Sequence, residues 1–270
     1  MELTLNMDEF EVILQKCKTI IFAHRGASGY EYENTMKSFY KAIELGADGL
    51  ETDAWLLADG NIVLHHDKGV KIDELTKNIS KMTLDEIKKV KLSNNEQIPT
   101  IDEFFEEFSK LKTVGNNPIV YSIDLQDSSV GLKLAEFFKE NTFDEKLTER
   151  VILCGDSLVK LRKVREINKE IKIVASNQEN AIKPENFIGD TKYNQLKIFG
   201  FNISKDSFKE KYKEILDSAG LKCFIWDLHS EQSLNQYLIY KPHAIYSNFP
   251  DLALKTRNNL IKKENKIIEN

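Results

Sequence analysis

The stretch GLETDAWLLADGNIVLHH, residues 49–66, decides how the strands of this chain can be assembled. It holds two apolar runs, and the pair Asp59-Gly60 between them is a signal for a β-hairpin with a two-residue turn. The second run therefore returns beside the first and does not begin a new helix-linked unit. We predict that residues 62–66 form the return arm of a hairpin that prolongs the strand at 49–55.

This hairpin makes a geometric prediction. If Asp59 and Gly60 form the turn, paired positions sum to 119, and Asp53 faces His66. Glu51 and Asp53 point the same way, because side chains alternate along a strand with a period of two. We therefore expect Glu51, Asp53 and His66 to cluster at one end of the strands.

The rest of the chain repeats an apolar run followed by a helical pattern. Including the hairpin, there are nine runs of β character, and helical patterns separate most of them. The runs span 19–24, 49–55, 62–66, 118–125, 151–155, 171–176, 198–204, 222–228 and 244–249. The helical patterns span 34–46, 101–111, 128–141, 157–168, 207–220 and 230–240.

Continuous apolar strands that alternate with helices indicate a parallel sheet covered on its outside. Without the hairpin arm eight βα units are left, which predicts a (β/α)8 TIM-type barrel. We expect one domain over residues 1–270, with the hairpin extension after strand 2, a small insertion at about 67–98 and a helix end in the last fifteen residues. In such barrels the site lies where the strands end at their carboxyl side.

Composition narrows the possible partners. The 270 residues are 41% hydrophobic and carry a net charge of −5, so no basic field indicates nucleic acid as a ligand. The N-terminal stretch has no long apolar run, and we expect no stable membrane insertion. Cys17, Cys154 and Cys223 form no metal-binding or disulfide pattern and suit a reducing compartment, so we expect a cytoplasmic protein. The oligomeric state is left open.

Polar side chains gather at the ends of four expected strands. Neighbouring carboxylates at strand ends repel one another unless a cation lies among them, and oxygen ligands suit the hard ions Ca²⁺ and Mg²⁺. Histidines beside such an ion fit general acid and base roles, and an arginine offers a planar fork to a phosphate. The side chains are His24 and Arg25, Glu51 and Asp53, His66 and Asp67, and Asp124.

Other interpretations of single residues stay open. Glu51 or Asp53 alone could be a helix cap or a surface charge. His65 is expected to be structural, because its neighbour His66 has the register that faces Asp53. Asp67 either closes a turn or holds His66 in one tautomer.

Three residues late in the chain are harder to assign. His229 and His243 lie in or beside loops with no identifiable partner, and we expect structural roles. Trp226 ends an apolar strand, so it belongs either to the core or to the wall of a pocket.

The order of the motifs resembles the glycerophosphodiester phosphodiesterase family, a group of metal-dependent barrel enzymes in the phospholipase-C-like superfamily. The similarity is dense from Ile20 to Phe104 and includes the segment 75–90. It is thinner later in the chain, where IWDL (225–228) corresponds to W-x-x-N in the family and AIYSNFPDL (244–252) to I-x-T-D-x-P. The motifs are AHRG (23–26), ENT (33–35), the F-x-x-A-x-x-x-G-A-D pattern at 39–48, ETD (51–53), DGNIVLHHD (59–67) and IPTIDEF (98–104).

The resemblance implies a role for each matching position. His24 and His66 match the general base and general acid, and Arg25 matches the arginine that grips the phosphate. Glu51 and Asp53 match two metal ligands, and Asp124 stands at the position of the third. Further substrate-binding positions are Glu33, Gln126 and Trp226.

The chain departs from the family pattern at three of these motifs. Tyr32 replaces a proline, Asp124 replaces a glutamate, and Gln126 replaces a lysine, which subtracts a positive charge near the phosphate. Lys205 or another cation from a late loop could fill the place of that lysine.

The resemblance implies hydrolysis of a glycerophosphodiester to an alcohol and sn-glycerol 3-phosphate, with Ca²⁺ or Mg²⁺ as cofactor and a small-molecule phosphodiester as substrate. One alternative is the cleavage of a lysophospholipid or another hydroxyl-bearing phosphodiester with a cyclic phosphate product. Another is a phosphodiester-binding protein with little turnover.

Overall fold

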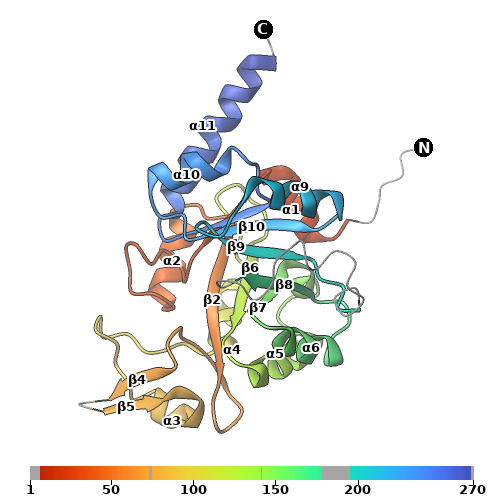
Figure 1. Ribbon diagram of the computed structural model, residues 1–270. Coiled ribbons are helices and arrows are strands. Elements are labelled where there is room, and N and C mark those ends of the chain that lie inside the picture. Colours follow the sequence, from red (N-terminus) through yellow and green to blue (C-terminus); the bar gives the residue numbers. More distant parts are fainter. Residues whose placement is uncertain (1–6, 73–74, 141, 178–194, 269–270) are drawn as a thin grey trace.

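The computed structural model describes residues 7–72, 75–140, 142–177 and 195–268. Its main sheet closes on itself, because β1 pairs in parallel with both β2 and β11. The predicted (β/α)8 barrel is therefore confirmed (Figure 1). The sheet consists of β1 (Ile20–Ala23), β2 (Gly49–Leu56), β3 (Ile62–Leu64), β6 (Val120–Leu125), β7 (Val151–Gly155), β8 (Lys172–Asn177), β9 (Gly200–Ser204), β10 (Lys222–Trp226) and β11 (Ala244–Ser247).

Helices connect the strands where the helical patterns predicted them. Several begin at the expected kind of cap; at α4, Thr100 and Glu103 form a reciprocal capping box. The stretch 178–194 between β8 and β9 lies outside the described residues. The helices of the barrel are α1 (Glu9–Cys17), α2 (Met36–Glu44), α4 (Ile101–Phe108), α5 (Ser128–Glu140), α6 (Leu158–Ile167), α9 (Glu210–Ser218), α10 (Glu231–Leu238) and α11 (Pro250–Ile268).

Two apolar cores hold the barrel together. The larger core packs the outward-facing strand residues against the surrounding helices. The second fills the barrel interior with large side chains such as Phe22, Phe224 and Tyr246, and α1 adds Phe10 and Ile13 to it. The amino-terminal end of the barrel is thus filled, and the polar cavity lies at the carboxyl end.

The insertion folds as a small unit beside the barrel. It comprises β4 (Gly69–Ile72), β5 (Leu75–Asn78), the 3-10 turn η1 (Ile79–Lys81) and α3 (Leu84–Ile87). Its buried residues form a separate apolar cluster with Trp55 and Val63 of the β2–β3 hairpin. In Figure 1 the insertion and the carboxyl end of α11 lie on opposite sides of the barrel.

The β2–β3 hairpin forms as predicted, but its register differs by one residue. Ala54 pairs with Leu64, so paired positions sum to 118 and not to 119. The Leu57 N–H donates to the carbonyl oxygen of Asn61, and Gly60 adopts a positive φ of 87°. The turn therefore has three residues and ends in a left-handed glycine, which the dipeptide signal did not distinguish from a two-residue turn.

The register changes which histidine lies opposite the acidic strand. The His65 N–H donates to the carbonyl oxygen of Asp53, so the predicted pairing of Asp53 with His66 is wrong. Strand β3 ends at Leu64, and strict alternation of side chains does not continue to His66. The His66 side chain nevertheless lines the polar cavity of the barrel.

Candidate active site

A cavity of about 170 Å³ opens at the carboxyl ends of the barrel strands. Eight of the nine predicted site residues line it, and the ninth, Glu33, contacts Arg25 from outside. Ser176, Asn202 and Tyr246 complete the wall and were not predicted. The eight residues are His24, Arg25, Glu51, Asp53, His66, Asp124, Gln126 and Trp226.

Three carboxylates, those of Glu51, Asp53 and Asp124, form an acidic group at one side of this cavity. Glu51, Asp53 and Asp124 can place one oxygen each within 4.8 Å of one another, although Glu51 and Asp53 are only 2% and 3% exposed. Burial, followed by the charge of Asp53, raises the pKa of Asp124 to about 7 and that of Glu51 well above its usual range. One Asp124 oxygen, Oδ1, is buried and has no hydrogen-bond partner in the described parts of the chain. An orphaned carboxylate oxygen in an all-oxygen group fits a hard divalent cation.

Asp53 is held in place from three directions. Its Oδ2 accepts a hydrogen bond of 3.0 Å from the Asn34 side chain and lies 3.2 Å from Arg25 Nε. Its Oδ1 accepts a bond of 2.6 Å from Gln126 Nε2. Asn34 belongs to the ENT motif but had no predicted role. Its Oδ1 also accepts a hydrogen bond of 2.7 Å from the Thr52 hydroxyl. These bonds fix the carboxylate that all three neighbours share.

Arg25 is paired with protein carboxylates on two sides. Its Nη1 lies 2.9 Å from Glu33 Oε2, and its backbone N–H donates to Glu51 Oε2 at 2.7 Å. Arg25 donates this backbone bond from a left-handed conformation, with φ of 55°. Arg25 therefore ties the acidic group to the loop after β1.

The glycines of AHRGASG serve packing. A Cβ at Gly26 would lie 2.3 Å from Ser38 Oγ of α2, and one at Gly29 would meet the Phe249 ring at the same distance. Gly26 lets the loop after β1 approach α2, which is the reason this position accepts no side chain.

Both histidines predicted to be catalytic have a partner at Nδ1. His24 Nδ1 lies 2.7 Å from Asn248 Oδ1, and His66 Nδ1 lies 2.9 Å from Asp67 Oδ1. Since each oxygen can only accept, each ring carries its proton on Nδ1 and directs Nε2 elsewhere. Burial, followed by the charge of Arg25, lowers the pKa of His24 to about 4. His24 is therefore neutral at pH 7.

His229 has partners that the sequence did not reveal. Its ring stacks on His24 with centroids 5.6 Å apart, and its Nε2 lies 2.9 Å from Asp227 Oδ1. Its Nδ1 accepts from the Asn248 N–H at 3.1 Å. Asp227 also pairs with Lys205, so that lysine is already neutralised and does not line the cavity.

The remaining unassigned groups have structural roles. His243 Nδ1 accepts a bond of 3.0 Å from the Cys223 N–H. All three cysteines are free and buried. Burial raises the pKa of Cys17 and of Cys223 to about 12, which makes them poor nucleophiles.

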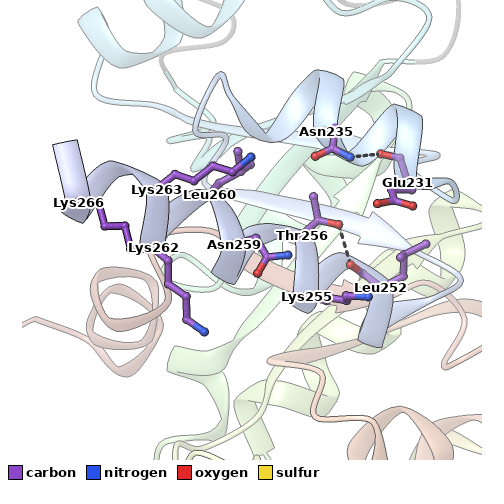
Figure 2. A pocket seen from close by; sticks show the side chains of 10 residues that line it. All are labelled: Glu231, Asn235, Leu252, Lys255, Thr256, Asn259, Leu260, Lys262, Lys263 and Lys266. Carbon is purple, nitrogen blue, oxygen red and sulfur yellow. Dashed lines mark hydrogen bonds between the residues drawn. The ribbon is translucent and has the colours of Figure 1, made fainter.

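A larger hollow of 460 Å³ lies between α10 and α11 (Figure 2). Several lysines of α11 line it, while Asn235 and Thr256 bond to carbonyl oxygens of their own helices. Titratable groups with strongly perturbed pKa values gather in the smaller cavity instead. That cavity is the candidate active site.

Comparison with known proteins identifies the family. The model of the glycerophosphoryl diester phosphodiesterase family matches residues 24–252. The chain belongs to this family. It is therefore an enzyme of the phosphoric diester hydrolase class.

The glycerophosphodiester phosphodiesterase of Caldanaerobacter subterraneus is 30% identical over 261 residues, covering 91% of this chain and 99% of that protein. A crystal structure of a glycerophosphodiester phosphodiesterase from Parabacteroides distasonis has the same fold, with a TM-score of 0.74 and 20% identity over 90% of this chain and 98% of that one. An Oleispira antarctica phosphodiesterase in complex with the product sn-glycerol-3-phosphate gives a TM-score of 0.75 and 19% identity over 91% and 99% of the two chains. In the described parts of this family member, no helix is both long and apolar enough to cross a bilayer.

Proposed function

We propose that this enzyme hydrolyses glycerophosphodiesters to an alcohol and sn-glycerol 3-phosphate, using Ca²⁺ or Mg²⁺. The observation that carries the proposal is the buried acidic group, with its orphaned Asp124 oxygen, beside two histidines that each have Nδ1 satisfied. A binding protein of little turnover has no need of two such imidazoles. The bound product of the Oleispira phosphodiesterase supports the choice of product.

Glu51, Asp53 and Asp124 would hold the cation. When bound, it would neutralise the acidic group and draw charge away from the phosphate oxygens. In this proposal Arg25 would contact the same phosphate, since its side chain lines the cavity beside the acidic group.

The two histidines would divide the proton transfers. Neutral His24 would accept a proton at Nε2 from the hydroxyl next to the phosphate as that oxygen attacks phosphorus, because its Nδ1 is occupied by Asn248. His66, when protonated on both ring nitrogens, would donate its Nε2 proton to the leaving alcohol while Asp67 holds Nδ1, and this step leaves a cyclic phosphate. In a second step neutral His66 would take a proton from a water that attacks the cyclic phosphate, and His24 would return its proton to the reopened hydroxyl to give sn-glycerol 3-phosphate. The 40% exposure of the His66 side chain supports an exit for the alcohol at the mouth of the cavity.

The test is release of sn-glycerol 3-phosphate from glycerophosphocholine, measured with and without chelator and after addition of Ca²⁺ or Mg²⁺. We expect activity that chelation abolishes and a divalent ion restores. Phosphorus NMR of the products distinguishes the hydrolase from a lyase, which would release a cyclic phosphate. Full activity in excess chelator would exclude the ion, and no product from any of several phosphodiesters would favour a binding protein.

A matched pair of variants tests the proton donor. His66→Ala should reduce kcat by at least about a hundredfold, whereas His65→Ala should have little effect, because His65 is not part of the cavity wall. Equal losses in the two variants would contradict the assignment of His66.

A further inference from the structure

Two buried polar atoms in the cavity wall have no hydrogen-bond partner among the residues that the structure describes. Ser176 Oγ and Asn202 Oδ1 make no hydrogen bond, although these residues are only 6% and 5% exposed. Burying such a group without a partner costs about 1–3 kcal/mol, so buried polar atoms are almost always paired. Both side chains line the same cavity as the acidic group, which makes a ligand in that cavity the available partner.

The two residues form one small surface. Ser176 and Asn202 are directly paired across β8 and β9. Around the closed barrel, β9 is the fourth strand from β2 in either direction, so Asn202 lies across the barrel from Glu51 and Asp53. Trp226 follows on the next strand, β10, where it is paired with Ser204 of β9. This wall is neutral and partly aromatic, whereas the opposite wall is charged.

We propose that Ser176 and Asn202 form a subsite for the terminal hydroxyl of the substrate's glycerol arm, the hydroxyl that takes no part in the reaction. The inference rests on the proposed function, because it assumes a phosphate held between Arg25 and the acidic group. Asn202 Oδ1 accepts a hydrogen bond from this hydroxyl, and Ser176 Oγ bonds to the same group. Trp226 covers the carbon chain.

The geometry assigns this subsite to the glycerol arm and not to the leaving alcohol. The cavity of 170 Å³ is smaller than the roughly 300–1,000 Å³ of sites for drug-sized ligands. The inner wall therefore has room only for a short arm of the substrate. The leaving alcohol departs past the half-exposed His66 into solvent, so the cavity wall does not limit its size. In this proposal the subsite selects for the terminal hydroxyl on the glycerol side of the phosphate.

The experiment compares glycerophosphocholine with its analogue made from propane-1,2-diol. The analogue keeps the hydroxyl next to the phosphate ester and lacks only the terminal one. The wild type should prefer glycerophosphocholine in kcat/KM by at least about tenfold, because the analogue leaves both wall atoms unpaired. Asn202→Leu, which keeps the size of the side chain, and Ser176→Ala should each reduce this preference to within about threefold.

Ser122→Ala is the matched control. Ser122 lies on β6 and bonds to the Tyr246 hydroxyl, and it is not part of the cavity wall, so this variant should keep the wild-type preference. Melting temperatures verify folding, and Ser176→Ala should melt no lower than the wild type, because it removes an unpaired buried hydroxyl.

The outcomes separate the two proposals. If the wild type cleaves both substrates equally well, or if Asn202→Leu and Ser176→Ala both keep the tenfold preference, the subsite is wrong while the proposed function stands. If the wild type cleaves neither substrate in the presence of Ca²⁺ or Mg²⁺, the proposed function fails first.

Discussion

Replacing Asp124 by asparagine should stabilise the metal-free protein. Burial and the neighbouring Asp53 raise the pKa of Asp124 from 3.8 to about 7, which means that the folded protein resists ionisation of this carboxyl. One pKa unit corresponds to about 1.36 kcal/mol, so the penalty at pH 7 or above is at most about 4 kcal/mol. An amide retains a buried unpaired oxygen at a cost of about 1 kcal/mol, and we expect a net gain of about 2–4 kcal/mol.

The sign of the pH dependence follows from the direction of the pKa change. Below pH 3.8 the carboxyl is protonated in both the folded and the unfolded state, and the wild type suffers no penalty. The penalty then grows as the pH rises towards 7. Asp124→Asn should therefore melt about 4–15 °C above the wild type at pH 8 in chelator, and the difference should vanish near pH 4.

Thermal melts followed by circular dichroism measure this difference. Asp85→Asn is the control, because it makes the same change of charge at an exposed residue of α3. Ca²⁺ or Mg²⁺ should narrow this difference, since the wild type keeps all three carboxylate ligands and gains about 2.7 kcal/mol at a hundredfold excess over Kd. A wild type that melts at or above the variant in chelator at pH 8 would refute the repulsion argued for the acidic group.

Three further changes test other parts of the molecule. His24→Ala should reduce kcat by at least about a hundredfold at pH 7 without loss of fold, and a near-normal rate would remove His24 from the mechanism. Gln126→Lys should raise kcat/KM for glycerophosphocholine several-fold, because Lys205 is already paired with Asp227 and supplies no charge to the cavity. The increase should be smaller at high salt. A kcat/KM well below that of the parent would show that the bond from Gln126 to Asp53 matters more than an added charge. Burial lowers the pKa of His243 to about 4, so the unfolded chain binds a proton at this residue at a higher pH than the folded protein does. The free energy of unfolding should therefore fall by about 1–2 kcal/mol between pH 6.5 and 4, after allowance for the partial exposure of the ring. His243→Asn keeps an acceptor for the Cys223 N–H and should lessen that fall in urea titrations; an unchanged slope would assign the acid sensitivity to other groups.

The barrel could be predicted because its signals are local. Continuous apolar runs and capped helical patterns each depend on neighbouring residues, and the single hairpin at Asp59-Gly60 reduced nine runs to eight. The exact register of that hairpin could not be predicted, since a left-handed Gly60 serves two- and three-residue turns equally well. His66 was placed correctly in the cavity although the pairing argument for it was wrong.

The sequence predicted those site residues whose type alone indicates a chemical role. Carboxylates, histidines and arginine at strand ends stand out in a sequence. Ser176 and Asn202 do not, because serine and asparagine are common everywhere, and only the closed barrel shows that they are buried and unpaired. His229 and Asn248 were missed for a different reason: each contacts His24 across more than 200 positions of sequence, and no local pattern encodes such a contact.

The seam of the barrel has a consequence for biosynthesis. Strand β1 pairs with β11, Ile20 opposite Ala244, and His24 receives its acceptor from Asn248 directly after that seam. On the ribosome, β1 leaves the exit tunnel long before its partner strand has been translated. The hydrogen bond that orients His24 can therefore form only when nearly the whole chain has emerged. A nascent or truncated chain that ends before residue 244 would carry Glu51, Asp53 and Asp124 yet lack the bond between His24 and Asn248. Because such distant pairings form slowly, closure of this seam is the expected rate-limiting step in gaining activity.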